Sequence, residues 1–152
     1  MANDKGMTTS KPVGDDYEEA FWNDGITPVV REQPIPRRGY DLEERTAQFG
    51  EAIIDLAKAI PQNAVTNRII SQLVGAATSV RANYVEADDA VSKKEFLKSI
   101  ETCRKEARET KHFLRMIDRA VPQLKPQARI LWTEAKELHL IFSKIWRTGK
   151  NE

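Results

Sequence analysis

From Leu42 onward, apolar residues recur at alternating intervals of four and three positions, in four stretches separated by short polar or proline-containing segments. This spacing places the apolar side chains on one face of an α-helix, whereas a half-buried strand would alternate at every second residue. The four stripes, in chain order, are Leu42, Thr46, Phe49, Ile53, Leu56 and Ile60; Ile69, Leu73, Ala76, Val80 and Ala87, with Tyr84 beside them; Phe96, Ile100, Cys103, Ala107, Thr110, Leu114, Ile117 and Val121; and Ala128, Leu131, Ala135, Leu138, Phe142 and Ile145. The pattern predicts four helices and no strand.

Residues that favour helix ends flank the stripes. Asp41, with Glu44 three residues later, predicts an N-cap and N3 pair for the first helix, which Pro61 ends. Pro122 ends the third helix, and Pro126 fits the first turn of the fourth, because a proline there gives up no intrahelical hydrogen bond. The four predicted helices are therefore joined by short connections.

Short connections place consecutive helices antiparallel, and helices with stripes of this kind pack at a crossing angle of about 20°. The start of the third helix is marked by the sequence "SKKE". This sequence is a capping box, in which the Ser92 side chain accepts from the amide of Glu95 and the Glu95 carboxylate accepts from the amide of Ser92. We therefore predict an all-α fold, an up-down-up-down antiparallel four-helix bundle over residues 40–152, with a mostly irregular N-terminal extension.

Residues 1–39 differ from the rest, since they carry four of the seven prolines and show no helical period. Their one concentrated apolar segment is "YEEAFWND", in which Tyr17 and Phe21 share a helical face and Trp22 lies beside them. One interpretation is a flexible leader with too little apolar surface to fold. The other is a docking peptide that packs on this or another subunit, because aromatic side chains are unfavourable in water.

The charge balance excludes a strongly basic protein, because the 152 residues carry a formal net charge of +1. Residues 1–39 contain five Lys or Arg and seven Asp or Glu, and residues 40–152 contain nineteen and sixteen. Any affinity for nucleic acid must then come from a local patch. The sequence contains no apolar secretory segment, no membrane span and only one cysteine, so we predict a cytoplasmic protein without membrane contact.

Candidate catalytic and metal-binding residues are few. A bundle can hold a di-iron site through two inward-facing Glu-x-x-His pairs, but Glu109 and His112 form the one such pair and point away from the predicted core. The other histidine, His139, follows Lys136 rather than a glutamate. Cys103 lies on an apolar stripe, which indicates a buried side chain rather than a reactive thiolate. We predict no catalytic residue, no metal and no cofactor.

The third predicted helix carries a row of cations beside its apolar stripe. On a helical wheel the members fall within about 80° of one another. They are Arg104, Arg108, Lys111, Arg115 and Arg119. Such a row is stable only if it faces acids, a polyanion or ample water. The structural interpretation is a solvated face partly paired with Glu101 or with neighbouring helices. The functional interpretation is a patch that binds the phosphate backbone without reading bases.

Four polar residues follow one border of the second stripe: Gln72, Ser79, Asn83 and Glu86. At that border they are neither fully solvated nor dry, and buried amides and carboxylates need hydrogen-bond partners. We interpret them as structural or assembly residues that bond between helices and fix their register. The alternative is a contact with another subunit or with a ligand.

Six large apolar residues lie off the four stripes: Ile54, Ile70, Phe113, Trp132, Ile141 and Trp146. A monomeric bundle would expose several of them, and contiguous exposed apolar surface usually marks an interface. This feature predicts a homo-oligomer.

Residues 71–114, "SQLVGAATSVRANYVEADDAVSKKEFLKSIETCRKEARETKHFL", carry a denser pattern. It resembles that of the bacterial four-helix bundle proteins associated with intervening sequences in 23S ribosomal RNA genes. The matching positions are Ser71, Gln72, Leu73, Thr78, Ser79, Ala82, Asn83, Glu86, Ala87, Ser92, Phe96, Lys105, Glu106, Ala107, Glu109 and Thr110. The resemblance spans about residues 41–148, and the first and fourth helices match in pattern more than in residue identity.

The resemblance implies an up-down bundle, a ring-shaped homopentamer and no known catalytic activity. The family is similar to the accessory proteins of diversity-generating retroelements, basic pentamers that bind nucleic acid and partner a reverse transcriptase. Arg81 departs from the family pattern, in which a small residue is usual, and adds a cation to the predicted nucleic-acid contacts. We therefore predict a non-catalytic oligomer that binds RNA or DNA through its third helix. The alternative is a protein-interaction scaffold that binds no nucleic acid.

Overall fold

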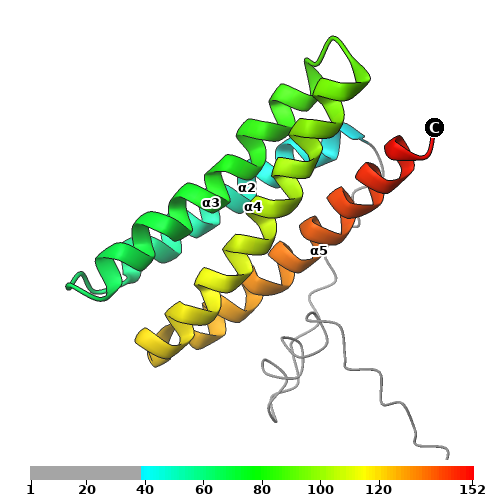
Figure 1. The fold of residues 1–152 in the computed structure, drawn as a ribbon. Coiled ribbons are helices and arrows are strands. Elements are labelled where there is room, and N and C mark those ends of the chain that lie inside the picture. The colour runs from blue at the N-terminus through cyan, green and yellow to red at the C-terminus, as the bar shows by residue number, and fades with distance from the viewer. Residues whose placement is uncertain (1–38) are drawn as a thin grey trace, which may run out of the picture. The chain divides into compact units, whose positions relative to one another are not determined.

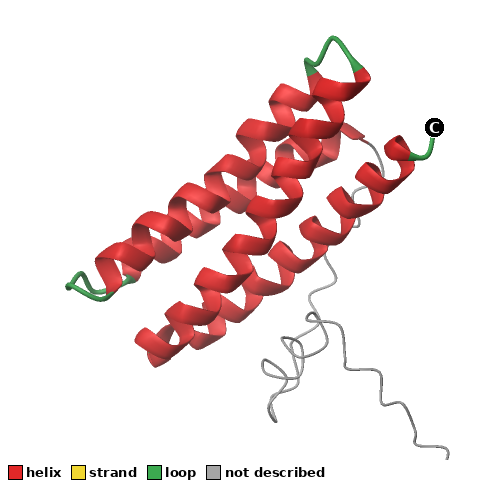
Figure 2. Ribbon diagram, viewed as in Figure 1, coloured by secondary structure: helices red, strands yellow, loops and turns green. Residues whose placement is uncertain are grey.

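The computed structural model describes residues 39–152, and Figure 1 shows them as antiparallel helices. The helices are α2 (Gly39–Ala59), α3 (Thr66–Asp88), α4 (Lys93–Ala120) and α5 (Lys125–Lys150), and a short 3₁₀ turn, η1 (Pro122–Leu124), links α4 to α5. This part of the chain contains no strand (Figure 2). The predicted four-helix, all-α fold is confirmed. The predicted extension, with its docking segment, lies outside the described residues, apart from Gly39.

Each helix packs on its neighbour in sequence, and α2 closes the ring against α5 through the smallest of the four helix interfaces. Consecutive helices reverse direction because their connections are too short to return along the bundle. As a result α2 begins and α5 ends at the same end of the bundle (Figure 1). Arg45 on α2 forms ion pairs with Glu134 and Glu137 on α5, which tie the closing pair together.

The core consists of the predicted stripes. The six residues of the first stripe are all buried, and Ile53, Leu73 and Ile100 have no exposed surface. Cys103 is also fully buried, and its thiol donates to the carbonyl oxygen of Val80 at 3.4 Å. Burial raises the pKa of this thiol to about 12, as a structural side chain requires. The apolar period therefore marks the buried face of each helix.

Two helix starts differ in detail from the prediction. α2 begins at Gly39, so Asp41 lies in its first turn instead of at the N-cap. Ser92 caps α4 as predicted, because its side-chain oxygen accepts from the Glu95 amide at 3.1 Å. The Glu95 carboxylate accepts from the amide of Val91 at 3.4 Å rather than from that of Ser92, so half of the capping box forms.

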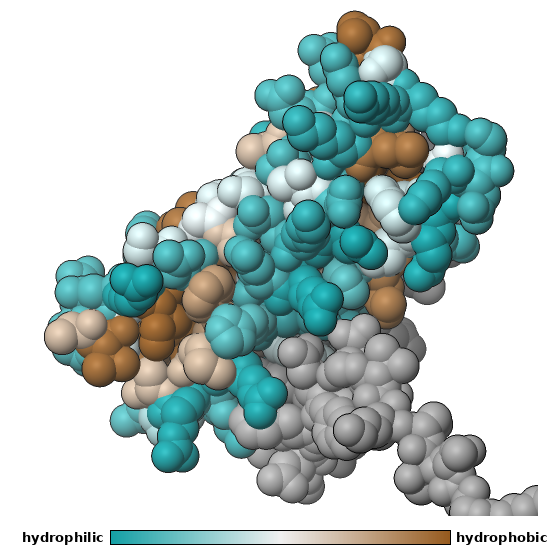
Figure 3. All heavy atoms as spheres, in the orientation of Figure 1, coloured by the Kyte–Doolittle hydropathy of each residue, from teal (hydrophilic) through white to brown (hydrophobic). Residues whose placement is uncertain are grey.

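The face of the bundle seen in Figure 3 is mostly hydrophilic, with hydrophobic residues in small separate patches. Val65 and Val91, in the loops that flank α3, are 65% and 90% exposed. Among the apolar residues predicted to lie off the stripes, Ile54 is 37% exposed, whereas Trp132 is only 3% exposed. The other four, Ile70, Phe113, Ile141 and Trp146, are half-buried, so one of the six is exposed to a large extent and Trp132 belongs to the interior. None of the helices in residues 39–152 combines the length and the apolar character that a membrane span needs.

Candidate nucleic-acid interface

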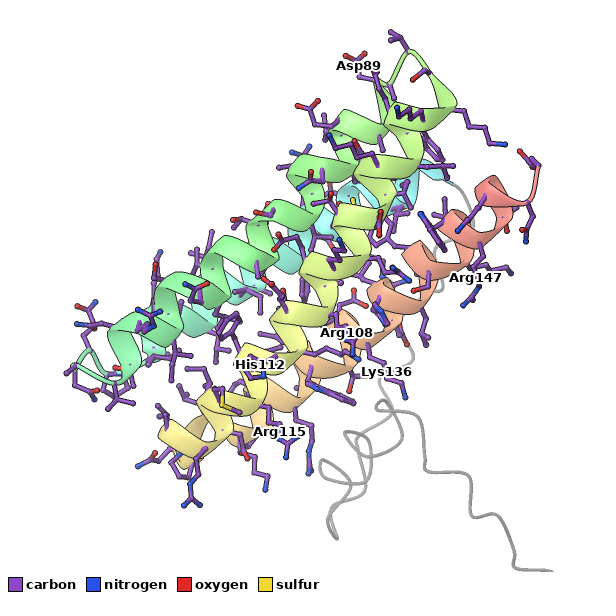
Figure 4. All side chains as sticks on the ribbon, in the orientation of Figure 1. Asp89, Arg108, His112, Arg115, Lys136 and Arg147 are labelled. Carbon is purple, nitrogen blue, oxygen red and sulfur yellow. The ribbon has the colours of Figure 1, made fainter. Side chains whose placement is uncertain are left out.

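Cations of α4 and α5 gather where these two helices pack side by side. We call this set the α4–α5 basic face and include the two tryptophans that lie among the cations. Its members are Arg104, Arg108, Lys111, Arg115, Arg129, Trp132, Lys136, Trp146, Arg147 and Lys150. Figure 4 labels Arg108 and Arg115 on α4 and Lys136 and Arg147 on α5.

The α5 half of the face follows the same spacing as the α4 half. Arg129, Trp132, Lys136, Trp146 and Lys150 recur at intervals that keep them on one flank of the helix. That flank faces α4, because its tryptophans contact α4 cations. Two helices therefore build one surface, and neither carries it alone.

Each tryptophan ring carries one cation from each helix. The guanidinium carbon of Arg104 lies 5.0 Å from the centroid of the Trp146 ring, and Lys150 Nζ lies 4.6 Å from it. Lys111 Nζ lies 5.6 Å and Lys136 Nζ 6.0 Å from the centroid of a Trp132 ring. These distances are within the range at which the ring quadrupole attracts a cation.

Burial divides the predicted row of α4 cations. Arg108 and Arg119 are exposed, and Arg104 and Arg115 are half-buried. Lys111 is only 1% exposed, so the prediction that it lies open to a phosphate is wrong. It occupies the edge of the row nearest the apolar stripe, where packing against α5 covers it.

Glu101 lies beside the N-terminal end of this row. Glu101 Oε1 lies 3.8 Å from Arg104 Nη2 and 3.7 Å from Lys105 Nζ, as the structural interpretation of the row predicts for Glu101. Ion pairs exposed to this degree contribute little, about 0 to 1 kcal/mol. Within residues 39–152, no ion pair involves Arg108 or Arg147. Arg108 and Arg147 therefore present exposed charges that no acid of the described residues pairs with.

Arg129 adds buried donors to the face. Its Nε and Nη2 atoms are buried and have no hydrogen-bond partner among residues 39–152. A buried guanidinium nitrogen without an acceptor is unusual in a folded protein.

Arg81, the other predicted nucleic-acid contact, does not belong to this surface. It is exposed on α3, and its Nη2 lies 3.3 Å from Glu43 Oε1 on α2. The α2–α3 seam is on the opposite side of the helix ring from the α4–α5 seam. Arg81 therefore lies apart from the α4 cations, and its contact with nucleic acid stays a prediction.

The polar border of α3 is held together within its own helix. Ser79 Oγ donates to the carbonyl oxygen of Gly75 at 2.6 Å, and Asn83 Nδ2 donates to that of Ser79 at 2.8 Å. Gln72 and Glu86 are exposed. The prediction that Ser79 and Asn83 bond between helices is therefore wrong. Their acceptors are backbone carbonyls one turn earlier in α3. The role of these four residues in assembly stays a prediction.

The side chains of Asn83 and Glu86 also border a shallow polar groove between α3 and α4. Four residues of α4 complete it: Glu95, Lys98, Ser99 and Thr102. Farther along α4, Glu109 and His112 are both exposed, so this Glu-x-x-His pair faces away from the core as predicted. No group of three metal-ligating side chains assembles anywhere in residues 39–152.

The α5 half of the face is what the sequence interpretation missed. Trp132 and Trp146 were assigned to leftover apolar surface, although cations at helical spacing flank both of them in the sequence. The signal was the interleaving of Arg129, Lys136 and Lys150 with the two aromatic positions. This pattern of alternating cations and tryptophans indicates a basic face only when α4 is known to pack against the same flank of α5.

Comparison with known proteins agrees with the fold. Residues 40–144 match the family model described as 23S rRNA-intervening sequence protein. A solved structure of a protein of unknown function from the S23 ribosomal protein family, from Bacteroides thetaiotaomicron, is similar to this chain with a TM-score of 0.60. The two are 23% identical, and the similarity covers 69% of this chain and 97% of that one. Among curated proteins, none matches this sequence.

Proposed function

The chain belongs to the 23S rRNA-intervening sequence protein family, and we propose that it is a non-catalytic protein that binds the phosphate backbone of RNA or DNA on its α4–α5 basic face. The observation that carries the proposal is the convergence of cations from two helices on one face of a chain whose formal net charge is only +1. Clustering of this kind is the electrostatic footprint of nucleic-acid binding.

The chemistry of the face favours phosphate over base recognition. Arg108 is exposed and takes part in no ion pair among the described residues. A guanidinium presents its N–H groups in a planar fork that matches a phosphate group. Contacts with phosphate position a nucleic acid but carry no sequence information. Binding should therefore depend weakly on sequence and strongly on salt.

The test is fluorescence anisotropy with labelled RNA and DNA, single-stranded and duplex, across a series of salt concentrations. We expect the affinity of the wild-type chain to fall steeply between about 50 and 200 mM salt, because bound cations release counterions. The double variant Arg108→Glu/Arg147→Glu should weaken binding and reduce the slope of log affinity against log salt by about one per lost contact. Both residues are exposed, so the fold should survive.

The matched control is Lys58→Glu/Arg68→Glu, which makes the same change of charge at exposed sites on α2 and α3. Binding by the control should remain close to that of the wild-type chain. Equal weakening by both double variants would show a non-specific effect of net charge and contradict the proposal. Absence of wild-type binding at low salt would favour the protein-interaction scaffold instead.

We also propose that the protein forms a homo-oligomer, with the homopentamer as the expected state. Apolar side chains at Ile54, Val85 and Leu140, one on each of α2, α3 and α5, are 37%, 39% and 48% exposed, and their burial between copies would favour self-association. Several copies would multiply the basic face and raise avidity. Sedimentation equilibrium measures this directly, and a stable monomer at micromolar concentration would contradict it. A reverse transcriptase or other protein as partner stays a prediction.

A further inference from the structure

We infer that Trp132 and Trp146 are positioning residues for an extended phosphate backbone: Trp146 holds Arg104 and Lys150 in place, and Trp132 holds Lys136. Lys111 is buried at the Trp132 ring and joins the two helices without reaching the ligand. The inference rests on the proposed function and adds a role for side chains that carry no charge. Its basis is that each ring carries one cation from α4 and one from α5: Arg104 and Lys150 on Trp146, Lys111 and Lys136 on Trp132.

The rings act through the cations and not on bases. Trp132 is 3% exposed, so a nucleobase cannot stack on its face. Trp146 is half-buried, and two cations already lie within 5.0 Å of its centroid. Stacking platforms for bases need an open ring face. The described geometry instead fits rings that orient their charged neighbours.

Orientation matters because lysine and arginine side chains lose rotamer freedom when they bind a phosphate. A cation that already rests on an aromatic ring has lost part of that freedom before the ligand arrives. The affinity then increases without any additional contact with the ligand. Since each ring joins α4 to α5, it also fixes the spacing of cations across the seam.

The spacing identifies the class of ligand. Trp132 and Trp146 lie about four turns apart on α5, which is about 21 Å along the helix axis. The exposed Arg108 lies between Arg104 and Lys111 on the neighbouring helix. A strand of nucleic acid has one phosphate for every 3.4 Å or so of duplex axis, so the face can span about six phosphates. The ligand is therefore a polynucleotide backbone rather than a mononucleotide or inorganic phosphate.

The test uses the full chain and a double-mutant cycle at Trp146, which is half-buried. We expect Trp146→Leu to weaken polynucleotide binding about threefold, while Trp146→Phe retains most of the affinity because it keeps an aromatic face. In an Arg104→Gln/Lys150→Gln background, Trp146→Leu should have no further effect. A purely structural role of the ring would weaken binding equally in both backgrounds, and this result would overturn the inference.

The salt dependence gives a second readout. Trp146→Leu leaves every cation present, so the slope of log affinity against log salt should stay at its wild-type value. Arg104→Gln/Lys150→Gln should reduce that slope by about two. Oligonucleotides should bind more tightly with increasing length up to about six nucleotides, and inorganic phosphate should not compete with them at equal concentration. Binding that is independent of length would contradict the extended ligand.

An NMR measurement without nucleic acid separates the two proposals. The side-chain protons of Arg104 should show ring-current shifts in the wild-type chain and lose them in Trp146→Leu. If the shifts are present and no nucleic acid binds, the proposed function fails, and with it the role of the rings in binding. If nucleic acid binds the wild-type chain and Trp146→Leu equally well, the positioning inference fails and the proposed function stands.

Discussion

The buried thiol of Cys103 predicts a loss of stability at alkaline pH that a single substitution removes. Burial raises the pKa of this thiol from 9.0 to about 12, and the side chain has no exposed surface. The folded chain therefore keeps a proton that the unfolded chain releases as the pH rises above 9. The corresponding stability is fully present below pH 9 and is lost progressively between pH 9 and pH 12.

The size of the effect follows from these two pKa values. At pH 10 about nine-tenths of the unfolded thiol is ionised, whereas the folded thiol remains protonated, so the free energy of unfolding should fall by about 1.4 kcal/mol. We expect this loss in the wild-type chain and not in Cys103→Ala. Urea unfolding at pH 8 and pH 10, followed by far-UV circular dichroism, measures both proteins.

Other groups also titrate in this range. The test therefore compares the loss of unfolding free energy between pH 8 and pH 10 in the wild-type chain with the same loss in Cys103→Ala. Burial, followed by the charges of Asp88 and Glu43, raises the pKa of Tyr84, which makes the bundle less stable above pH 10 in the same direction. Tyr84 is present in both proteins, and its contribution largely cancels. If the wild-type chain and Cys103→Ala lose the same stability between pH 8 and pH 10, the argument from the buried thiol is refuted.

Two further substitutions test local features of the helices. Ser92→Ala should lower the free energy of unfolding by about 1 kcal/mol, because the Glu95 amide loses its acceptor, and Ser92→Asp should retain the stability in urea titrations. Gly75→Ala should raise the free energy of unfolding by up to about 1 kcal/mol and increase the melting temperature, because the residue lies inside α3 and an added Cβ meets nothing within 4 Å. A lower melting temperature for Gly75→Ala would contradict the open surroundings of that position.

The apolar period of the sequence is sufficient for the architecture. Stripe residues such as Ile53, Leu73 and Ile100 are fully buried because a helix that buries one face must repeat its apolar residues with the helical period. Helix starts are less well determined, as α2 shows by beginning at Gly39 ahead of the predicted cap. The backbone in the first turn of a helix needs no particular side chain to become helical. Sequence signals therefore locate the first residue of a helix only to within a residue or two.

The candidate site could be predicted only in part, because a helical wheel describes one helix at a time. Arg108 is exposed as its wheel position predicts, whereas Lys111 on the same row is buried against α5. Ser79 and Asn83 use backbone carbonyls of their own helix, an outcome that residue type alone does not distinguish from bonding between helices. The contact of a tryptophan on α5 with a cation on α4 depends on how the two helices pack against each other. The spacing of residues along one helix does not contain that information.

The unequal interfaces around the helix ring also determine how the bundle can open. α2 meets α5 over the smallest interface, with Arg45 as its charged tie, whereas α4 packs extensively on both α3 and α5. Release of α2 is therefore the local unfolding event that breaks the fewest helix contacts, and it leaves α3, α4 and α5 together. In that opened state the basic face stays whole, while the inner apolar flanks of α3 and α5 become accessible. Release of α2 would thus expose the interior of the bundle without changing the α4–α5 basic face.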